Sequence, residues 1–337
     1  MNTERQHKRW LWLVAVALIA VVVLLVVNRK PAPAPVLRLP VRIGIPQQLP
    51  SSLMMIAQQQ GFFAAEGLDV ELHRYPSGTR ALSEGLLSGA VDYVSAADFS
   101  FVSHVFAQPE LTAISCISLN TNSFRILARR DRGVAKLSDL QGKTIALQAS
   151  SATQYFLHGV QEVERIDKLH TVYAPIEQLG SGLLVGKYDA ISIREPYLQQ
   201  IAQQLGDNAV ILAEPGSYVR HELLLTRRSA LRARPVVADR MLRALLAAEA
   251  FVAAHPQQAA AVVSRFMEMP NVGTLPGAEL AIEYELSLPQ ALLFMLDAQA
   301  QWMRAEGLVQ APAPDFFKHI DTAAFKRVLP VRATLIE

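Results

Sequence analysis

Strand-like and helix-like segments alternate from Val41 onward, and this alternation limits the folds open to the chain more than any other feature. Each segment is short, and glycine, proline or serine separates it from the next. The predicted strands are Val41–Ile45, Asp69–Arg74 and Asp92–Ser95, and the predicted helices are Leu53–Gln60, ended by Gly61, and Thr79–Leu87. Strands that alternate with helices at this spacing predict a mostly parallel sheet in an α/β fold.

The pattern restarts in the second half of the chain. The predicted strands there are Lys143–Leu147, His170–Ala174, Ala190–Ile193 and Ala209–Leu212, with a helix at Ser150–Val163. From Ser229 onward the chain is alanine-rich, with apolar residues at helical spacing.

One internal match links the two halves. Leu86–Tyr93 and Leu183–Ala190 each predict the end of a helix, a left-handed glycine and an aspartate that leads into a strand. Two lobes of similar build would produce this match, as would the general preference of helix-to-strand turns for Gly and Asp.

The N-terminal residues predict a membrane anchor. Residues 1–9 form a short basic N-terminus, and the segment 10–27 is uncharged and just long enough to cross a bilayer as a helix. A signal peptide would have a shorter apolar core and a small-residue cleavage site, whereas Asn28, Arg29 and Lys30 follow here. We therefore expect an uncleaved transmembrane helix, followed by a proline-rich linker over residues 28–40. Basic residues flank both sides of the segment, so the charge rule leaves its orientation open.

Composition excludes several classes of function. The net charge is +2 and no basic stripe is interleaved with aromatic residues, so no nucleic-acid partner is expected. Cys116 is the only cysteine and lies in an apolar run, which excludes an intrachain disulfide and predicts a buried strand residue. Gly142-Lys-Thr144 mimics a phosphate-binding loop but has Leu137 in place of the required glycine. We expect neither a cofactor nor a metal ion.

The stretch Ala57–Glu71 carries a family resemblance. Its phrase Gly61-Phe-Phe, two alanines and Glu66-Gly-Leu-Asp-Val-Glu71 resembles the opening of the nitrate/sulfonate/taurine-type substrate-binding proteins of ABC importers. That family also contains binders of thiamine-pyrimidine precursors. Leu86–Asp92, Asp139–Ile145 and Gly186–Pro196 resemble its later motifs in order. The residues of the first stretch have structural roles of their own, since Gly61 would end a helix and Phe62 and Phe63 would pack under the sheet.

The resemblance implies an α/β, two-lobed type II periplasmic-binding-protein fold with the ligand between the lobes. We place the crossings between lobes near Ala128–Asp131 and Leu223–Arg227. Lobe one then comprises residues 41–130 plus 222–337, and lobe two comprises residues 131–221. The resemblance also implies an ABC permease and an ATPase as partners, and a soluble part outside the cytoplasm of a bacterial inner membrane.

Loops that follow strands supply the candidate ligand contacts. In open α/β sheets, ligands bind beyond the carboxyl ends of the strands, where helix N-termini favour anions. Simple N-capping would also explain the hydroxyl residues in these loops. The candidates are Gln47, Ser51, Ser52, Ser77, Asp98, Ser150, Ser151 and Thr153.

Arg194 and Glu195 follow a strand of lobe two and complete the set. Relatives often have an aromatic residue near the position of Arg194, so the ligand is not transferred by analogy. Arg194 would clamp an anion bidentately or would form a surface salt bridge. Glu195 would instead accept from an amino group or a pyrimidine N–H.

Three functions compete. The first is the import of a small anionic or zwitterionic solute, such as a sulfonate, nitrate or taurine, with no enzyme activity. The second is a pyrimidine-synthesising enzyme of the same fold, which would need a cysteine-rich motif. The third is a membrane-tethered sensor or accessory domain, which would need a separate output partner.

Overall fold

The computed structural model describes residues 38–195, 197–212, 218–268 and 282–335. The predicted membrane anchor at 10–27 and nearly all of the predicted linker lie outside these residues. Within the described ranges, no helix has both the length and the apolar character needed to span a membrane.

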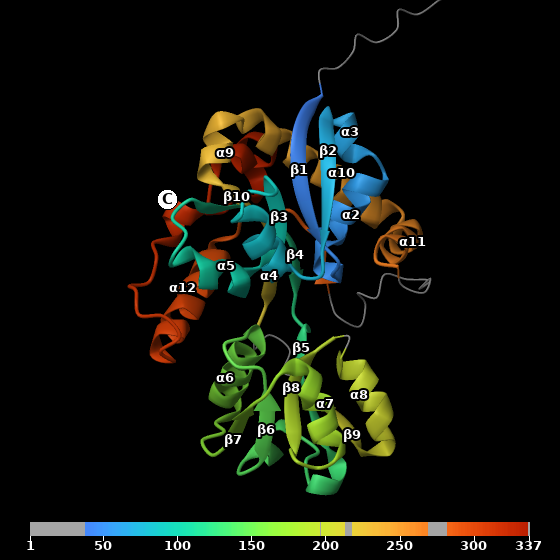
Figure 1. Cartoon of the computed structure of the whole chain (residues 1–337), viewed down its shortest axis with the longest axis vertical. Helices are drawn as coiled ribbons and strands as arrows, with labels where there is room; N and C mark the ends of the chain where they lie inside the picture. Colours follow the sequence, from blue (N-terminus) through green and yellow to red (C-terminus); the bar gives the residue numbers. More distant parts are fainter. Residues whose placement is uncertain (1–37, 196, 213–217, 269–281, 336–337) are drawn as a thin grey trace, which may run out of the picture. The chain divides into compact units, whose positions relative to one another are not determined.

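The strands of the described residues form two separate sheets (Figure 1). The first sheet has the order β11-β4-β10-β3-β1-β2. In it, β1 pairs in parallel with β2 and β3, whereas β10 runs antiparallel to β3 and β4. Its strands are β1 (Leu39–Pro46), β2 (Leu68–Tyr75), β3 (Tyr93–Ala97), β4 (Leu111–Asn120), β10 (Arg220–Arg227) and β11 (Ile282–Glu283).

The second sheet has the order β7-β6-β8-β5-β9. Its central strand β8 is parallel to β6 and antiparallel to β5, which in turn is antiparallel to β9. The strands are β5 (Phe124–Arg129), β6 (Thr144–Leu147), β7 (His170–Tyr173), β8 (Ala190–Arg194) and β9 (Ala209–Leu212). Both sheets are therefore mixed: β10 and β11 run against the other strands of the first sheet, and β5 runs against the other strands of the second. The remaining strands of each sheet share one direction.

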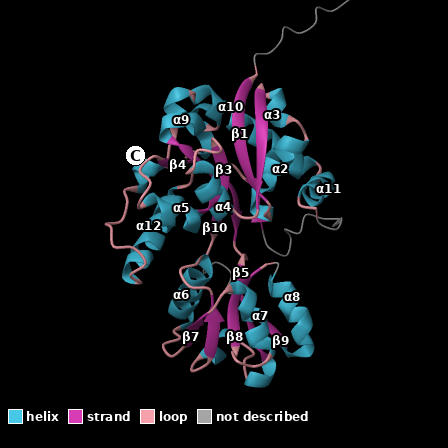
Figure 2. Cartoon of the chain, viewed as in Figure 1, coloured by secondary structure: helices cyan, strands magenta, loops and turns pink. Residues whose placement is uncertain are grey.

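Helices surround both sheets (Figure 2). They are α2 (Ser52–Gln59), α3 (Phe62–Ala65), α4 (Gly78–Arg80), α5 (Asp98–Val105), α6 (Ala152–Glu164), α7 (Ile176–Leu184), α8 (Tyr197–Leu205), α9 (Arg228–Ala233), α10 (Pro235–Ala254), α11 (Pro256–Phe266), α12 (Gln290–Ala305) and α13 (Ala323–Val328). The second sheet buries both of its faces. Ile145 and Leu147 of β6 join one apolar cluster with residues of α6, and Ala146 joins another with residues of α7 and α8. This alternation follows from the two-residue period of a strand.

The chain passes between the sheets at other points than the sequence indicated. It crosses over residues 121–123, between β4 and β5, and it returns somewhere between Leu212, where β9 ends, and Arg220, where β10 begins. Phe124–Arg129 and the segment 220–221 were placed in the wrong lobe, because β5 pairs with β8 and β10 begins at Arg220. The predicted crossings at 128–131 and 223–227 fall inside or at the end of paired strands.

The internal match of the sequence has a structural counterpart. Gly89 and Gly186 both have left-handed backbone, with φ of 84° and 75°. Asp92 accepts from the backbone N–H of Arg42 at 3.0 Å, and Asp189 accepts from that of Thr144 at 2.8 Å. In each lobe the aspartate therefore ties the incoming strand, β3 or β8, to the neighbouring parallel strand, β1 or β6.

The family-like stretch is structural. Gly61 has φ of 74°, between α2 and α3, and Gly67 has φ of 72° before β2. Phe63 is buried, and the ring of Phe62 meets that of Phe251 on α10 at 6.0 Å. Gly61 ends α2 as the sequence predicted, but Phe62 and Phe63 begin the short helix α3, and Phe62 packs against α10 rather than under the sheet.

Candidate functional site

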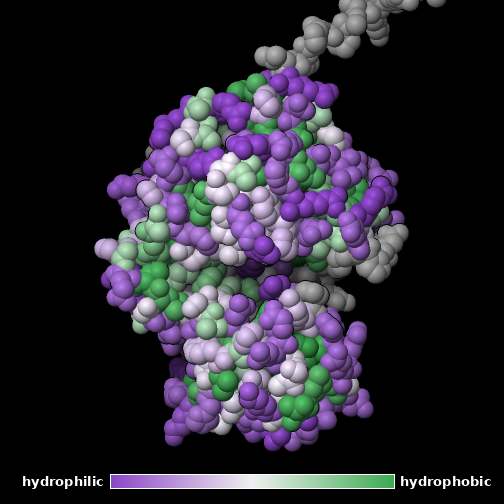
Figure 3. Space-filling model, viewed as in Figure 1, coloured by the Kyte–Doolittle hydropathy of each residue, from purple (hydrophilic) through white to green (hydrophobic). Residues whose placement is uncertain are grey.

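Strand directions bring the carboxyl edges of the two sheets together. In the first sheet β1, β2 and β3 end at one edge, where β10 begins at Arg220 and pairs Glu222 with Ala97. In the second sheet β6 and β8 end at one edge, where β5 begins with Phe124 opposite Arg194. The last residue of β4 pairs with the first residue of β10, and residues 121–123 connect it to β5. Four residue steps reach about 14 Å at most, so these two edges face each other. Figure 3 shows a hollow at this level with hydrophilic atoms at its bottom.

A buried carboxylate organises the first edge. Glu222 is 0% exposed, and its Oε1 accepts from Gln48 Nε2 at 2.9 Å and from Ser51 Oγ at 3.1 Å. Its Oε2 accepts from Arg220 Nη2 at 2.7 Å, and the Arg220 side chain is only 12% exposed. Burial raises the pKa of Glu222, while Arg220 and the hydroxyl and amide donors act in the opposite direction. The network thus fixes a guanidinium and an amide at the edge of the sheet.

Asp98 fastens the returning strand rather than facing open space. It is fully buried, and its Oδ2 accepts from the backbone N–H of His221 at 2.8 Å. Its Oδ1 accepts from the Tyr218 hydroxyl and from the N–H of Phe99. These partners satisfy the carboxylate internally. Asp98, which the sequence predicted as a ligand contact, is therefore engaged inside the first lobe and is not exposed at the carboxyl edge of the sheet.

The other predicted residues of the first lobe differ in their surroundings. Ser51 and Ser52 are buried, and Ser52 Oγ donates to the carbonyl of Leu49 at 2.6 Å. Ser77 caps α4 by accepting from the N–H of Arg80 at 3.3 Å. Gln47 is half-buried, and its backbone N–H donates to the carbonyl of Tyr75 at 2.8 Å. Capping and internal bonding thus account for the three serine hydroxyls.

The hydroxyls of the second edge form a short chain at the start of α6. Ser151 is the N-cap, donates to the carbonyl of Gln148 at 2.6 Å and lies 2.7 Å from Thr153 Oγ1. The N–H groups of Ala152 and Thr153 have no hydrogen-bond partner among the described residues. Ser150 is exposed and has φ of 51°. The backbone, more than the hydroxyls, presents free donors here.

Arg194 stands at the end of β8, next to the strand that leads into α6. Its Nη1 donates to the carbonyl of Glu195 at 3.2 Å, and its guanidinium lies 5.5 Å from the centre of the Tyr197 ring. Although part of Arg194 stays accessible, desolvation lowers the pKa of its guanidinium and the nearby charge of Arg220 lowers it further. No carboxylate pairs with it among the described residues. Glu195 caps α8 by accepting from the N–H of Gln199 at 3.3 Å.

Sequence reasoning missed Arg220, Glu222 and a group of aromatic residues. The only signal for the first two was the pair of charges that opens the apolar strand Leu223–Leu225. The aromatic group comes from both lobes: the ring of Tyr155 on α6 lies 6.2 Å from Phe99, 5.3 Å from Trp302 and 5.4 Å from Tyr218. No local pattern joins residues so distant in the sequence.

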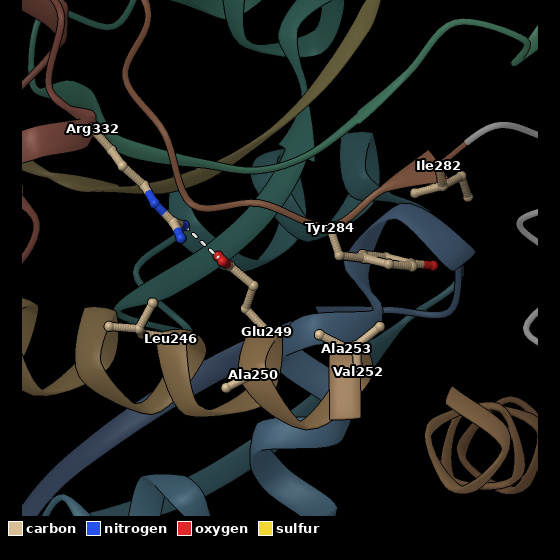
Figure 4. A pocket seen from close by; sticks show the side chains of 8 residues that line it. All are labelled: Leu246, Glu249, Ala250, Val252, Ala253, Ile282, Tyr284 and Arg332. Atoms are coloured by element: carbon tan, nitrogen blue, oxygen red, sulfur yellow. Dashed lines mark hydrogen bonds and ion pairs between the residues drawn. The ribbon is translucent and has the colours of Figure 1, made fainter. Parts of the chain in front are cut away.

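Two further features lie away from these edges. A cavity of about 500 Å³ is bounded by residues of α10, Tyr284 and the ion pair between Arg332 and Glu249 (Figure 4).

Cys116 is buried in β4, and burial raises the pKa of its thiol far above the ordinary range. The described part of the chain contains no group of three His, Cys, Asp or Glu residues suited to a metal ion.

Two α/β sheets joined by two crossings, with polar groups gathered at facing carboxyl edges, resemble the fold of the periplasmic binding proteins. The sequence model of the protein family described as NMT1/THI5 like matches residues 50–259, which is more than half of the 337-residue chain. The chain therefore belongs to this family, which confirms the resemblance seen in the sequence.

Solved structures of low sequence identity share the fold. The periplasmic aliphatic sulphonate binding protein SsuA from Escherichia coli has a TM-score of 0.71 and 16% identity, covering 84% of this chain and 92% of its own. The alkanesulfonate-binding protein SsuA from Xanthomonas axonopodis pv. citri, bound to MOPS, has a TM-score of 0.64 and 18% identity, covering 84% and 98%. The periplasmic nitrate-binding protein NrtA from Synechocystis PCC 6803 has a TM-score of 0.61 and 13% identity, covering 87% and 89%. No curated protein matches the sequence.

Proposed function

We propose that this protein is the solute-binding component of an ABC-type importer and that it holds a small anion or zwitterion between the two carboxyl edges. The observation that carries this proposal is Arg194, a guanidinium at the end of β8 without a carboxylate partner among the described residues. Arg220 lies close enough to lower its pKa further. An oxyanion would accept from Arg194 in a bidentate manner. The solved relatives, which bind sulfonates and nitrate, agree with this ligand class.

The start of α6 supplies the second half of the proposed anion site. The strands β6 and β8 are parallel neighbours, so the loop after β6 lies beside the end of β8. The free N–H groups of Ala152 and Thr153 and the positive end of the helix dipole would meet the acidic group there. Ser150, Ser151 and Thr153 border this position and add hydroxyl groups. Asp98 already accepts hydrogen bonds on both of its oxygens, which disfavours a neutral pyrimidine read by that carboxylate.

A ligand screen by thermal unfolding tests this function. The probes are MOPS, taurine, nitrate and, as the neutral rival, an aminopyrimidine. A probe at 100 times its dissociation constant should raise the free energy of unfolding by about 2.7 kcal/mol. We expect sulfonates or nitrate to raise the melting temperature and the aminopyrimidine to leave it unchanged. Stabilisation by the aminopyrimidine alone would replace the anion with a pyrimidine ligand.

Anchoring and assembly belong to the same proposal. The uncharged segment 10–27 would hold the soluble part at the outer face of an inner membrane, where a permease and an ATPase would receive the ligand. Fractionation of cells tests the anchor. We expect the full chain in the membrane pellet, and a soluble periplasmic form that begins near Pro31 would rule out the anchor without touching the ligand-binding proposal.

A further inference from the structure

Gln154 connects three parts of the molecule through one buried side chain. It lies in the first turn of α6 and is 9% exposed. Its Oε1 accepts from the backbone N–H of Ser150 at 2.8 Å. Its Nε2 donates to the hydroxyl of Tyr173 at 3.1 Å and to Glu306 Oε2 at 3.3 Å. One side chain therefore joins the loop after β6, the end of β7 and the end of α12.

The bond to Ser150 holds an unfavourable backbone conformation. Among the described residues, only Ser150, Arg165 and Glu268 combine a side chain with a positive φ. A left-handed conformation is costly for a residue with a Cβ, so Ser150 keeps it only if its surroundings compensate. The bond from its N–H to Gln154 is such a compensation. The loop it shapes leads directly into the free N–H groups of Ala152 and Thr153.

The bond to Glu306 extends this arrangement to the other lobe. Glu306 is the C-cap of α12, which packs within the first lobe. The residue after Gln154 makes the same connection, because the ring of Tyr155 packs edge-on against Trp302 of α12. The first turn of α6 is thus held by its own loop on one side and by α12 on the other.

We propose that Gln154 is a positioning residue for the anion site: it holds the loop 148–151 in its left-handed turn and ties that loop to α12, so that the N–H groups of Ala152 and Thr153 are fixed before ligand binds. This inference rests on the proposed function. A site whose donors are held in place in advance loses less conformational entropy on binding. Loss of Gln154 should therefore weaken binding although Gln154 does not touch the ligand.

The test measures the affinity of the full chain for MOPS by calorimetry. Gln154→Leu keeps the size of the side chain and removes its three hydrogen bonds. We expect about ten-fold weaker binding, which corresponds to about 1.4 kcal/mol. Gln161→Leu is the matched control, since Gln161 lies on the same helix and its Nε2 donates only to the carbonyl of Ile166 at 3.4 Å. Its affinity should equal that of the wild type.

A second variant separates positioning from general damage to the fold. Ser150→Gly removes the Cβ that makes the left-handed turn costly. Because Ser150 also borders the proposed site, the Ser150→Gly single variant gives the baseline for its own hydroxyl. Relative to that baseline, Gln154→Leu should weaken binding about three-fold less than it does in the wild type, whereas a purely structural role of Gln154 would predict the same loss in both backgrounds. Wild-type affinity in Gln154→Leu, or a loss that Ser150→Gly does not reduce, would overturn the inference. Failure of the wild type to bind MOPS, nitrate or taurine would instead count against the proposed function.

Discussion

At the scale of single residues, charge is arranged differently on the two facing edges. Arg220 forms an ion pair with the buried Glu222, and so its guanidinium is already engaged within the first lobe. Arg194 has the carbonyl of Glu195 and the Tyr197 ring as its partners and keeps its guanidinium available. A ligand anion would therefore gain most from Arg194.

Arg194→Ala should weaken the binding of a sulfonate or nitrate by about 10- to 100-fold, because a hydrogen bond to a charged group contributes about 1.5–3 kcal/mol. Calorimetry measures the loss. Arg130→Ala is the control, since Arg130 is exposed at the opposite end of β5 and donates to the carbonyl of Asp207 at 3.3 Å. Equal affinities for the two variants would place the anion elsewhere.

Asp92 makes the stability of the first lobe depend on pH. Burial alone would raise its pKa, but the hydrogen bonds and charges of Arg42 and the charge of Arg234 bring the pKa below the ordinary 3.8. A lowered folded-state pKa contributes stability above pH 3.8 that is lost as the pH falls below it. Urea unfolding at pH 5 and pH 3 should show this loss, and the Asp92→Asn variant should lack that share of it.

Asp189 provides the comparison, because its carboxylate accepts from the Thr144 N–H but forms no ion pair with an arginine among the described residues. At pH 7, Asp92→Asn should destabilise by about 1.5 kcal/mol, the low end for a lost hydrogen bond to a charged group, because the Arg42 side chain left behind is 40% exposed and can be hydrated. Asp189→Asn should cost clearly less. A similar loss of unfolding free energy for both variants would mean that the arginines around Asp92 contribute no stability.

At the scale of secondary structure, the two matching turns that lead into β3 and β8 each depend on a left-handed glycine, Gly89 and Gly186. Gly89 has φ of 84°, and an added Cβ would meet nothing closer than Arg227 Nη1 at 3.5 Å. Gly89→Ala should therefore destabilise by about 1 kcal/mol through backbone conformation alone. Gly89→Asn should cost less, since asparagine tolerates the left-handed region better. Chemical denaturation measures the free energy of unfolding of both variants. Equal losses would mean that the added Cβ, and not the left-handed backbone conformation, causes the destabilisation.

The sequence predicted most elements but not how the strands pair. The helix after Ser151 and the strands at 69–74, 190–193 and 209–212 lie within a few residues of their predicted positions. Local periodicity encodes such elements directly. It does not encode the partners of Phe124–Arg129. Those partners are residues of β8 and β9 that lie 62 to 86 positions further along the chain. The crossing was therefore predicted too late in the chain.

The candidate site shows the same limit. Arg194 and the residues from Ser150 to Thr153 could be proposed because they follow strands. The arrangement of Gln48, Ser51 and Arg220 around Glu222 could not, since it joins residues more than 170 positions apart in the chain. That Arg194 and the residues from Ser150 to Thr153 contact the ligand stays a prediction.

At the scale of the whole molecule, we expect the two crossings between the sheets to act as a hinge. Residues 121–123 form one connection, and the described end of the other is fastened by Asp98 to Tyr218 and His221. Rotation about such connections closes two lobes on a ligand that binds the closed state better. Small-angle scattering should show a smaller radius of gyration with a saturating anion. An unchanged radius under saturation would mean that binding needs no closure.

The buried position of Cys116 has a practical consequence for observing that motion. Thiol-reactive dyes attack the thiolate, and this thiol is both enclosed in β4 and held protonated by its surroundings. Val185 and Val331, which are 80% and 85% exposed on different lobes, can each be replaced by cysteine and labelled without removing the native one. Energy transfer between the two dyes would then follow single molecules as they open and close.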